Sequence, residues 1–431
     1  MEAANKKAWV VAVSMGYGHQ RTAYPLKYLA QEGRIINAND YPGIPAGDRR
    51  VWEGMRNVYE FISRLKRIPL IGGAIFAILD KLQEILSYYP KRDLSRPIPQ
   101  LRQAYFSIKR GWGKHLIEYC KSKNGALPFI STFFIPAFMA EFFNYPGEIF
   151  CVICDADISR AWAPLKPKES RIKYFVPTER AAERLKLYGI KKENIFLTGY
   201  PLPLENIGGE SAEIMKEDLK LRLLNLDPKK KYREKYKVLT EETLGKMPEE
   251  SDHPLTIMFA VGGAGAQKEI GIKAVKSLAV KIWAGDIKII LIAGTRKVIK
   301  EYFEKKLGKL GFANHKNIEI IYAAEIEEYF KKFNQSLRKT DILWTKPSEL
   351  SFYSSLGLPI IIAPAIGSQE DFNERWLLKS GFGNLQENPR FAYQWLLDWV
   401  EQGYLAESAM QGFIEGERSG TFNIQKIICG S

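Results

Sequence analysis

Gly16, Gly18 and His19 form the first group whose residue types and spacing could do chemistry. They follow a buried apolar run at 8–13 and precede a helix expected to begin near Thr22. Glycines in such a turn let the backbone approach a substrate closely, and a histidine imidazole can take up or release a proton near neutral pH. The pattern predicts a phosphate- or sugar-binding corner, with His19 as the candidate proton acceptor.

A second glycine-rich loop follows the apolar run 255–261 and consists of Gly262, Gly263, Gly265 and Gln267. Backbone N–H groups exposed by such glycines can hold a diphosphate. The loop opens the second half of the chain as the first loop opens the first half, and this position favours a paired, ligand-binding role.

The stretch 345–373 predicts a strand end, a helix, a second strand and a polar loop. Ser348 is expected to cap the helix, which ends at Gly357. Such a unit places a helix N-terminus and a polar loop at the carboxyl edge of a parallel sheet, where ligands of open α/β sheets bind. The polar residues expected at this edge are Lys346, Ser348, Glu349, Gln369, Glu370 and Asn373.

These motifs, in this order, resemble those of GT-B glycosyltransferases of the MurG and monogalactosyldiacylglycerol synthase group (glycosyltransferase family 28-like). The matching pieces are Gly16-x-Gly18-His19, Gly357-Leu-Pro359 and Gln369-x-x-x-Asn373. The acid of that family lies five residues before the glycine, where this chain has Phe352. Glu349 stands one helical turn earlier on nearly the same face, and we assign the ribose-binding role to it. The resemblance covers residues 8–30, 148–203 and 255–380.

The resemblance implies inverting transfer of a sugar from a UDP-linked donor to an acceptor hydroxyl. It places the diphosphate at 262–267 and near Ser348, and the sugar hydroxyls at Gln369 and Glu370. His19 would deprotonate or orient the acceptor, assisted by Asp155 or Asp157. These two acids could by themselves hold a divalent cation, but bound metal is not typical of GT-B enzymes, so no metal and no other cofactor is expected.

Two alternatives stay open. One is a nucleotide-sugar epimerase of the same fold, which would need further acid or base residues and no membrane surface. The other is a non-catalytic, membrane-bound nucleotide-sugar-binding protein that has kept the fold and lost the acid at position 352.

A chain of 431 residues is too long for one typical core. We predict an α/β protein with two Rossmann-like doubly wound domains facing a cleft. The expected parts are an acceptor-side domain at 1–203, a charged linker or insert at 204–254, a nucleotide-sugar domain at 255–390, and helices at 391–431 that pack back across both domains.

The net charge of +14 is concentrated in an insert at 49–123, where 16 Lys and Arg against 6 Asp and Glu leave +10. Within it Ile68–Leu79 carries no charge, and such a run is either a helix in a membrane interface or a buried helical pair. The local charge favours an anionic membrane surface, and hence a lipid or membrane-associated acceptor and glycolipid synthesis. No recognised nucleic-acid motif accompanies the charge, so no nucleic-acid partner is expected.

Targeting signals and cysteines point to the cytoplasm. Lys6 and Lys7 precede only a short strand, so no signal peptide is expected, and no apolar run reaches the ~20 residues that span a bilayer. Cys151 and Cys154 fall on one strand, and residues three apart on a strand point to opposite faces, so two buried thiols are predicted. We expect a cytoplasmic protein with reduced thiols, peripheral on the inner face of the membrane.

Overall fold

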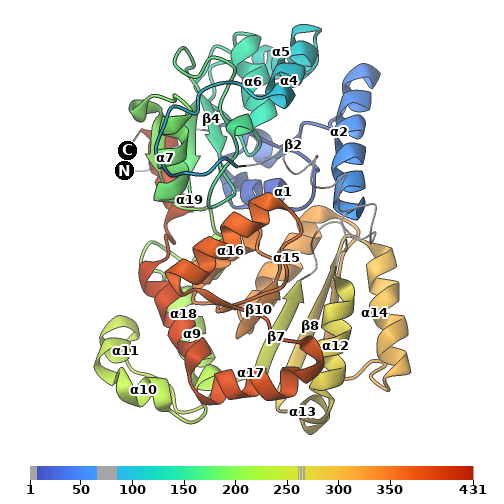
Figure 1. Ribbon diagram of the computed structural model, residues 1–431, viewed down its shortest axis with the longest axis vertical. Coiled ribbons are helices and arrows are strands. Elements are labelled where there is room, and N and C mark those ends of the chain that lie inside the picture. Colours follow the sequence, from blue (N-terminus) through green and yellow to red (C-terminus); the bar gives the residue numbers. More distant parts are fainter. Residues whose placement is uncertain (1–6, 66–84, 261, 263–264, 266, 431) are drawn as a thin grey trace. The chain divides into compact units, whose positions relative to one another are not determined.

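The computed structural model describes residues 7–65, 85–260, 262, 265 and 267–430, with the backbone alone for 58–65 and Ser368. It contains two compact units (Figure 1). Unit 1 comprises Met1–Pro201, Ile366–Asn373 and Ser419–Ser431, and unit 2 comprises Leu202–Ala365 and Glu374–Arg418.

Unit 1 is built on a parallel sheet of six strands in the order β2-β1-β3-β4-β5-β6. Its inner strands are short apolar runs buried on both faces, as expected for a parallel sheet covered by helices. The strands are β1 Trp9–Ala12, β2 Ile36–Asn37, β3 Phe129–Ser131, β4 Ile149–Val152, β5 Lys173–Val176 and β6 Ile195–Leu197. The helices are α1 Gly18–Ala23, α2 Ala46–Leu65, α4 Pro99–Lys109, α5 Lys114–Asn124, α6 Phe134–Phe142, α7 Glu179–Leu187 and α19 Gly420–Cys429, with 3₁₀ helices η1 Tyr24–Leu29, η2 Gln31–Gly33, η3 Arg160–Trp162 and η4 Lys192–Asn194.

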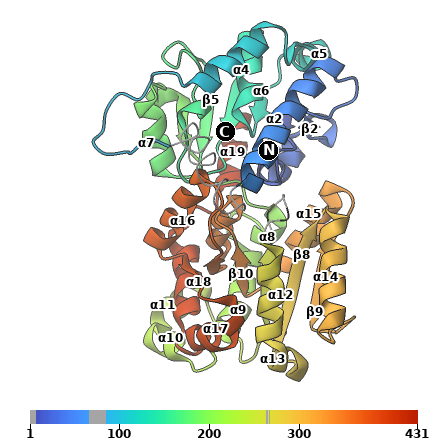
Figure 2. The same ribbon diagram turned by 45° about the vertical axis from the view of Figure 1, so that its right-hand side comes forward.

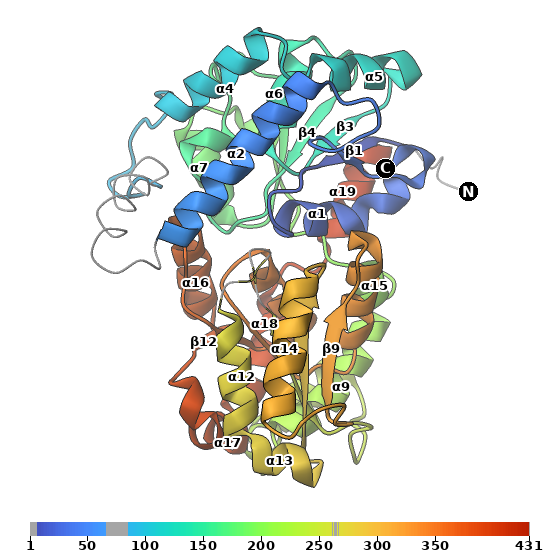
Figure 3. The same cartoon turned by 90° about the vertical axis from the view of Figure 1, so that its right-hand side faces the viewer.

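The last helix, α19, belongs to unit 1 and packs against η1 near the start of the chain (Figure 3). The Tyr28 hydroxyl donates to Gln425 Oε1 at 3.1 Å, and the Asn423 amide donates to the Thr198 carbonyl at 2.8 Å. The helices predicted at 391–431 therefore divide, since α17 and α18 belong to unit 2.

Unit 2 is built on a second parallel sheet of six strands, in the order β12-β11-β10-β7-β8-β9. Helices α12 and α14 contact each other and lie along its strands (Figure 2). The strands are β7 Leu255–Ala260, β8 Ile287–Gly294, β9 Ile318–Tyr322, β10 Ile342–Thr345, β11 Ile360–Ile362 and β12 Gly383–Leu385. The helices are α8 Leu204–Ile207, α9 Glu213–Leu226, α10 Lys231–Lys235, α11 Lys237–Leu244, α12 Lys268–Ser277, α13 Ala279–Ala284, α14 Lys297–Lys309, α15 Ile326–Leu337, α16 Ser368–Ser380, α17 Ala392–Glu401 and α18 Tyr404–Glu415, with η5 Glu349–Leu356 and η6 Pro389–Phe391.

The segment 204–254, predicted as a charged linker or insert, belongs to unit 2 and contains the packed helix α9. Arg222 of α9 is buried, and its guanidinium donates to the carbonyls of Thr340, Leu356 and Gly357. A Cβ on Gly357 would lie 2.9 Å from a methyl group of Leu219, so α9 packs closely on the end of η5.

Both sheets are doubly wound, which confirms the predicted fold class. In unit 1 the strands β2 and β3 lie on opposite sides of β1, and in unit 2 the strands β8 and β10 lie on opposite sides of β7. Each sheet therefore has a topological switch point, and ligands of such sheets bind beyond the carboxyl ends of the strands that flank it.

A buried charge cluster lies at the opposite, amino-terminal end of β10. Asp341 is fully buried and accepts hydrogen bonds from the Thr256 N–H, the Asn225 amide and His253 Nε2. His253 Nδ1 lies 2.5 Å from Asp252. Burial opposes the charge of this imidazole, but the two carboxylates outweigh it and raise the pKa of His253 above its usual value.

We expect this cluster to make stability depend on pH. The pKa of His253 is raised on folding, so its stabilising contribution is complete below the unfolded value of about 6.5 and is lost as the pH rises through the folded pKa. Denaturant unfolding of the parent protein and of His253→Gln at a series of pH values measures this. The difference between the two unfolding free energies should shrink as the pH rises, and a constant difference would contradict the raised pKa of His253.

Candidate functional site

The loop after β1 lies at the switch point of unit 1. The Ser14 N–H donates to Asn39 Oδ1 at 2.8 Å, and the Asn37 and Gln20 side chains donate to Ser14 Oγ. Gly16 has φ +92°, a conformation that favours glycine, so the predicted need for glycine holds at this position. These contacts fix the loop from which α1 begins.

His19, the second residue of α1, lies against the carboxyl end of the neighbouring strand β3. Its Nδ1 is 2.7 Å from the Thr132 carbonyl oxygen, and the Thr132 hydroxyl donates to the His19 carbonyl at 2.8 Å. A carbonyl can only accept, so Nδ1 carries a proton and Nε2 is the basic nitrogen of the neutral ring. The rings of Phe133 and Trp162 lie at centroid distances of 4.7 and 6.2 Å. The imidazole of His19 is thus held in one orientation at the end of β3.

Asp155 reaches the same place from the end of β4. Cys154 Sγ lies 3.5 Å from His19 Nδ1 and 3.9 Å from Asp155 Oδ2. The Asn373 amide donates to Asp155 Oδ1 at 3.1 Å and accepts from the Ala156 N–H at 2.8 Å. Asn373 is fully buried and uses both ends of its amide on this loop. Asn373 thus holds Asp155 in place, and its predicted contact with the donor stays a prediction.

Asp157 does not share that environment. It is buried, and Arg184 Nε and Nη2 donate to its two carboxylate oxygens at 2.8 and 2.7 Å. The predicted catalytic role of Asp157 is therefore replaced by a structural ion pair between the β4 loop and α7. Cys151 and Cys154 are buried thiols, as the sequence predicts.

The loop of unit 2 begins where β7 ends. Gly262 and Gly265 form a turn in which the Gly265 N–H donates to the Gly262 carbonyl at 2.7 Å, and Gly265 has φ +67°. Gln267 precedes α12 and donates through its amide to the Pro364 carbonyl at 2.7 Å. Gln267 thereby fastens the loop to the end of β11. Gly263 lies outside the described residues.

Two cations border this loop. Lys346 follows β10 directly, and a Cβ on Gly262 would lie only 2.5 Å from Lys346 Cε, so the glycine makes room for the lysine. Arg296 is the second residue after β8, and its Cδ would lie 4.0 Å from a Cβ on Gly265. Strands β8 and β10 flank β7 on its two sides, so cations from both neighbouring strands meet the glycine turn. Glycine turns bordered by cations suit a diphosphate.

Glu349 opens η5 directly beyond this edge and is half-buried. The expected helix is a 3₁₀ helix, in which residues three apart lie one above the other, so Glu349 shares the face of Phe352. Phe352 packs on Trp376 at a centroid distance of 5.0 Å. The prediction that Ser348 caps this helix through its side chain is wrong, because the helix begins with no side-chain cap.

Gln369 and Glu370 lie in the first turn of α16, in the segment Ile366–Asn373 that belongs to unit 1 rather than to the predicted domain 255–390. Both are half-buried. Glu370 Oε2 accepts from the Ile366 N–H at 2.7 Å, so one oxygen of this carboxylate holds the turn before the helix.

The sequence analysis missed three residues of these loops: Thr132, Cys154 as a neighbour of His19, and Arg296. Thr132 and Arg296 each lie just beyond the carboxyl end of a strand, β3 and β8, that neighbours the strand before a glycine loop. The signal available was therefore the polar residues within two positions of the end of each strand that neighbours a glycine loop. Within the part of the chain that the structure describes, no group of three or more His, Cys, Asp or Glu is placed to hold a metal ion.

Comparisons with known proteins give similar solved structures at low identity. No protein-family model matches the chain, and no curated protein matches its sequence. A UDP-GlcNAc 2-epimerase from Neisseria meningitidis bound to UDP-GlcNAc is 15% identical, with 79% of this chain and 84% of that chain covered and a TM-score of 0.43. MurG from Acinetobacter baumannii is 13% identical (76% and 79% covered, TM-score 0.43), and a glycosyltransferase from Rickettsia africae is 13% identical (98% and 98% covered, TM-score 0.42).

We expect Lys346→Gln and Arg296→Gln each to weaken binding of a UDP-sugar by about 10- to 100-fold, because a charge-assisted hydrogen bond contributes about 1.5–3 kcal/mol. The measurement is the dissociation constant by calorimetry. Lys297→Gln is the matched control, since Lys297 is adjacent to Arg296 but its side chain is 76% exposed and faces Glu301. If the control loses as much affinity as the two variants, the cations do not act through a site at the glycine turn.

Proposed function

We propose that this protein is a glycosyltransferase that moves a sugar from a nucleotide diphosphate donor, with UDP as the nucleotide, to a hydroxyl of a lipid or membrane-associated acceptor. The observation that carries the proposal is the His19 hydrogen bond to the Thr132 carbonyl, which fixes the orientation of the imidazole at the switch point of unit 1 and puts the proton of the neutral ring on Nδ1. The resemblance of the motifs to those of GT-B glycosyltransferases implies that this imidazole acts as a base on the hydroxyl of an acceptor.

The donor is assigned to the loop of unit 2. The Gly262–Gln267 turn with Lys346 and Arg296 would hold the diphosphate, and Glu349 would accept from the ribose hydroxyls. Gln369 and Glu370 are assigned to hydroxyls of the sugar, as the resemblance implies. Fixed cations and N–H groups of this kind stabilise the charge that grows on a leaving diphosphate and often supply the largest part of catalysis.

The proposed step is a single displacement. His19 Nε2 takes the proton of the acceptor hydroxyl as its oxygen attacks the anomeric carbon. The bond from that carbon to the diphosphate oxygen breaks, and its electron pair leaves with the nucleoside diphosphate. Attack opposite the leaving group inverts the anomeric carbon. Asp155 is held by Asn373, and the Cys154 thiol lies between it and His19. The negative charge of Asp155 favours the charged imidazole that forms.

The membrane-associated acceptor is supported by the charge of +10 in residues 49–123. Among the described residues, no helix combines the length and the apolar character that crossing a membrane would need. The apolar run Ile68–Leu79 lies outside the described residues. We propose a cytoplasmic protein bound peripherally to the inner membrane face.

A screen of nucleotide sugars by thermal shift, followed by a transfer assay with membrane lipids, tests the proposal. A ligand at 100 times its dissociation constant adds about 2.7 kcal/mol to stability, which a melting curve detects. Transfer of the sugar to a lipid hydroxyl is the expected result. Conversion of the donor to an epimer without any acceptor would establish the epimerase instead.

Glu349→Ala is expected to weaken binding of the identified UDP-sugar by about tenfold or more, because it removes a charged acceptor of the ribose hydroxyls. Glu328→Ala, which removes an exposed carboxylate paired with Lys332 on α15, is the control. Equal affinity of Glu349→Ala and the parent protein would show that Glu349 does not replace the family acid missing at Phe352.

A further inference from the structure

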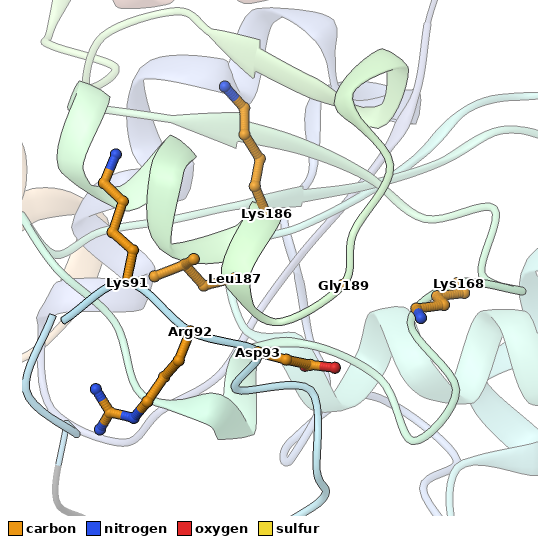
Figure 4. A pocket seen from close by; sticks show the side chains of 7 residues that line it. All are labelled: Lys91, Arg92, Asp93, Lys168, Lys186, Leu187 and Gly189. Carbon is orange, nitrogen blue, oxygen red and sulfur yellow. The ribbon is translucent and has the colours of Figure 1, made fainter. Parts of the chain in front are cut away.

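A hollow of about 310 Å³ lies in unit 1 at the end of α7, away from the His19 loop in the sequence. Figure 4 shows that its lining comes from three separate segments. Four of the seven lining residues are cationic and one is acidic. The lining residues are Lys91, Arg92, Asp93, Lys168, Lys186, Leu187 and Gly189.

The backbone of this hollow is built by specific contacts. The Leu94 N–H donates to the Leu187 carbonyl at 2.9 Å, which ties the first segment to the end of α7. Gly189 has φ +91°, and a Cβ there would lie 3.2 Å from Pro167, the residue before Lys168. Tight packing of three segments therefore fixes where the cations emerge.

Arg160, a buried residue that the His19 chemistry does not use, supports the same frame. Its guanidinium donates to the Ser95 carbonyl from Nε and Nη2 at 2.9 and 2.8 Å, and to the carbonyls of Ala163 and Pro164. This joins the chain after Asp93 to the chain before Lys168. Arg160 is thus a positioning residue for the hollow.

The charges around the hollow do not cancel. Lys91 and Lys186 share one carboxylate, Glu183, at 3.9 and 2.5 Å. Asp93 and Lys168 point toward one another in Figure 4. Four cations against the two carboxylates of Asp93 and Glu183 leave a net charge of +2.

Asp93 does not block the hollow to anions. The hydroxyl and the backbone N–H of Ser95 hold the pKa of Asp93 below its usual range, and the N–H donates at 2.7 Å. Its carboxylate is thus already satisfied by Ser95. A phosphomonoester carries about −1.5 to −2 charge at neutral pH, which matches the surplus of +2.

We propose that this hollow is a binding site for a phosphomonoester, with the headgroup of an anionic phospholipid as its favoured source. The lipid source is supported by the residues just before Lys91 in the chain. Tyr89 and Leu86 are 68% and 41% exposed, and Arg180 stacks 3.9 Å from the centre of the Tyr88 ring. Exposed tyrosine and leucine beside cations suit the headgroup region of a bilayer. The site does not depend on the proposed transfer reaction.

The test compares two double variants that remove the same charge. Lys168→Gln/Lys186→Gln removes two of the cationic side chains that line the hollow. Lys166→Gln/Lys191→Gln removes two exposed lysines that lie outside its lining. Binding is measured by cosedimentation with phosphatidylcholine vesicles that contain phosphatidic acid, and by calorimetry with glycerol 3-phosphate. All four lysines are exposed, so both doubles should melt at the parent temperature.

We expect the first double to bind phosphatidic acid vesicles about tenfold more weakly than the second, and glycerol 3-phosphate to bind poorly to all. Tight binding of glycerol 3-phosphate that the first double alone loses would keep the phosphomonoester site and assign it a soluble ligand. Equal weakening by the two doubles would leave only diffuse surface charge and overturn the site, as would a parent protein that binds neither probe. None of these binding results depends on sugar transfer, so they can be interpreted even if the transferase assay fails.

Discussion

His19→Ala should lose sugar transfer by a factor of about 10²–10⁴ while binding the donor as the parent protein does. Its Nδ1 proton is fixed on the Thr132 carbonyl at 2.7 Å, so the variant removes an oriented base and not merely a polar ring. The measurement is kcat for transfer at saturating donor, beside the donor dissociation constant. The expected pattern is a fall in kcat without a rise in that constant.

His315→Ala is the matched control for this variant. His315 also contacts aromatic rings, with its centroid 4.3 Å from Trp283, but it lies in unit 2 before β9 and away from the glycine turn. Its loss should leave kcat unchanged. Near-normal transfer by His19→Ala would remove His19 from the mechanism and make Asp155 the base.

Asp157→Ala should lower the free energy of unfolding by about 3–5 kcal/mol, because it leaves the fully buried Arg184 without its bidentate partner. Denaturant unfolding measures the loss. Glu169→Ala provides the control, since Glu169 pairs with Lys166 on the surface at side-chain exposures of 69% and 71%, and such pairs contribute about 0–1 kcal/mol.

The Asp157 variant also separates a structural role from a catalytic one. The fraction of Asp157→Ala that folds should transfer sugar at close to the parent rate. A variant as stable as the parent but inactive would restore the catalytic role that the sequence suggested. The double variant Asp157→Leu/Arg184→Met should be more stable than Asp157→Ala, because an apolar pair leaves no uncompensated charge.

The sequence by itself determined the two halves of the fold and the two glycine loops. Continuous apolar runs such as 9–12 and 255–260 predict strands without any tertiary information. The reason is that both faces of a parallel sheet are covered, so its strands are apolar throughout. Gly16 and Gly265 adopt positive φ, a requirement that local sequence alone expresses. His19 was found for the same reason, because it stands where a glycine turn meets a helix.

Only the tertiary structure decided which polar residues around these loops serve as partners. Asp155 and Asp157 are two residues apart, yet one lies beside the His19 loop and the other pairs with Arg184 on α7. The same holds for Asn373, whose partner Asp155 is 218 residues away, and for Arg222 of α9, which is buried and donates to carbonyls more than 100 residues away. The physical reason is that backbone conformation follows from neighbouring residues, whereas the partner of a buried charge or amide is set by which distant segments pack together.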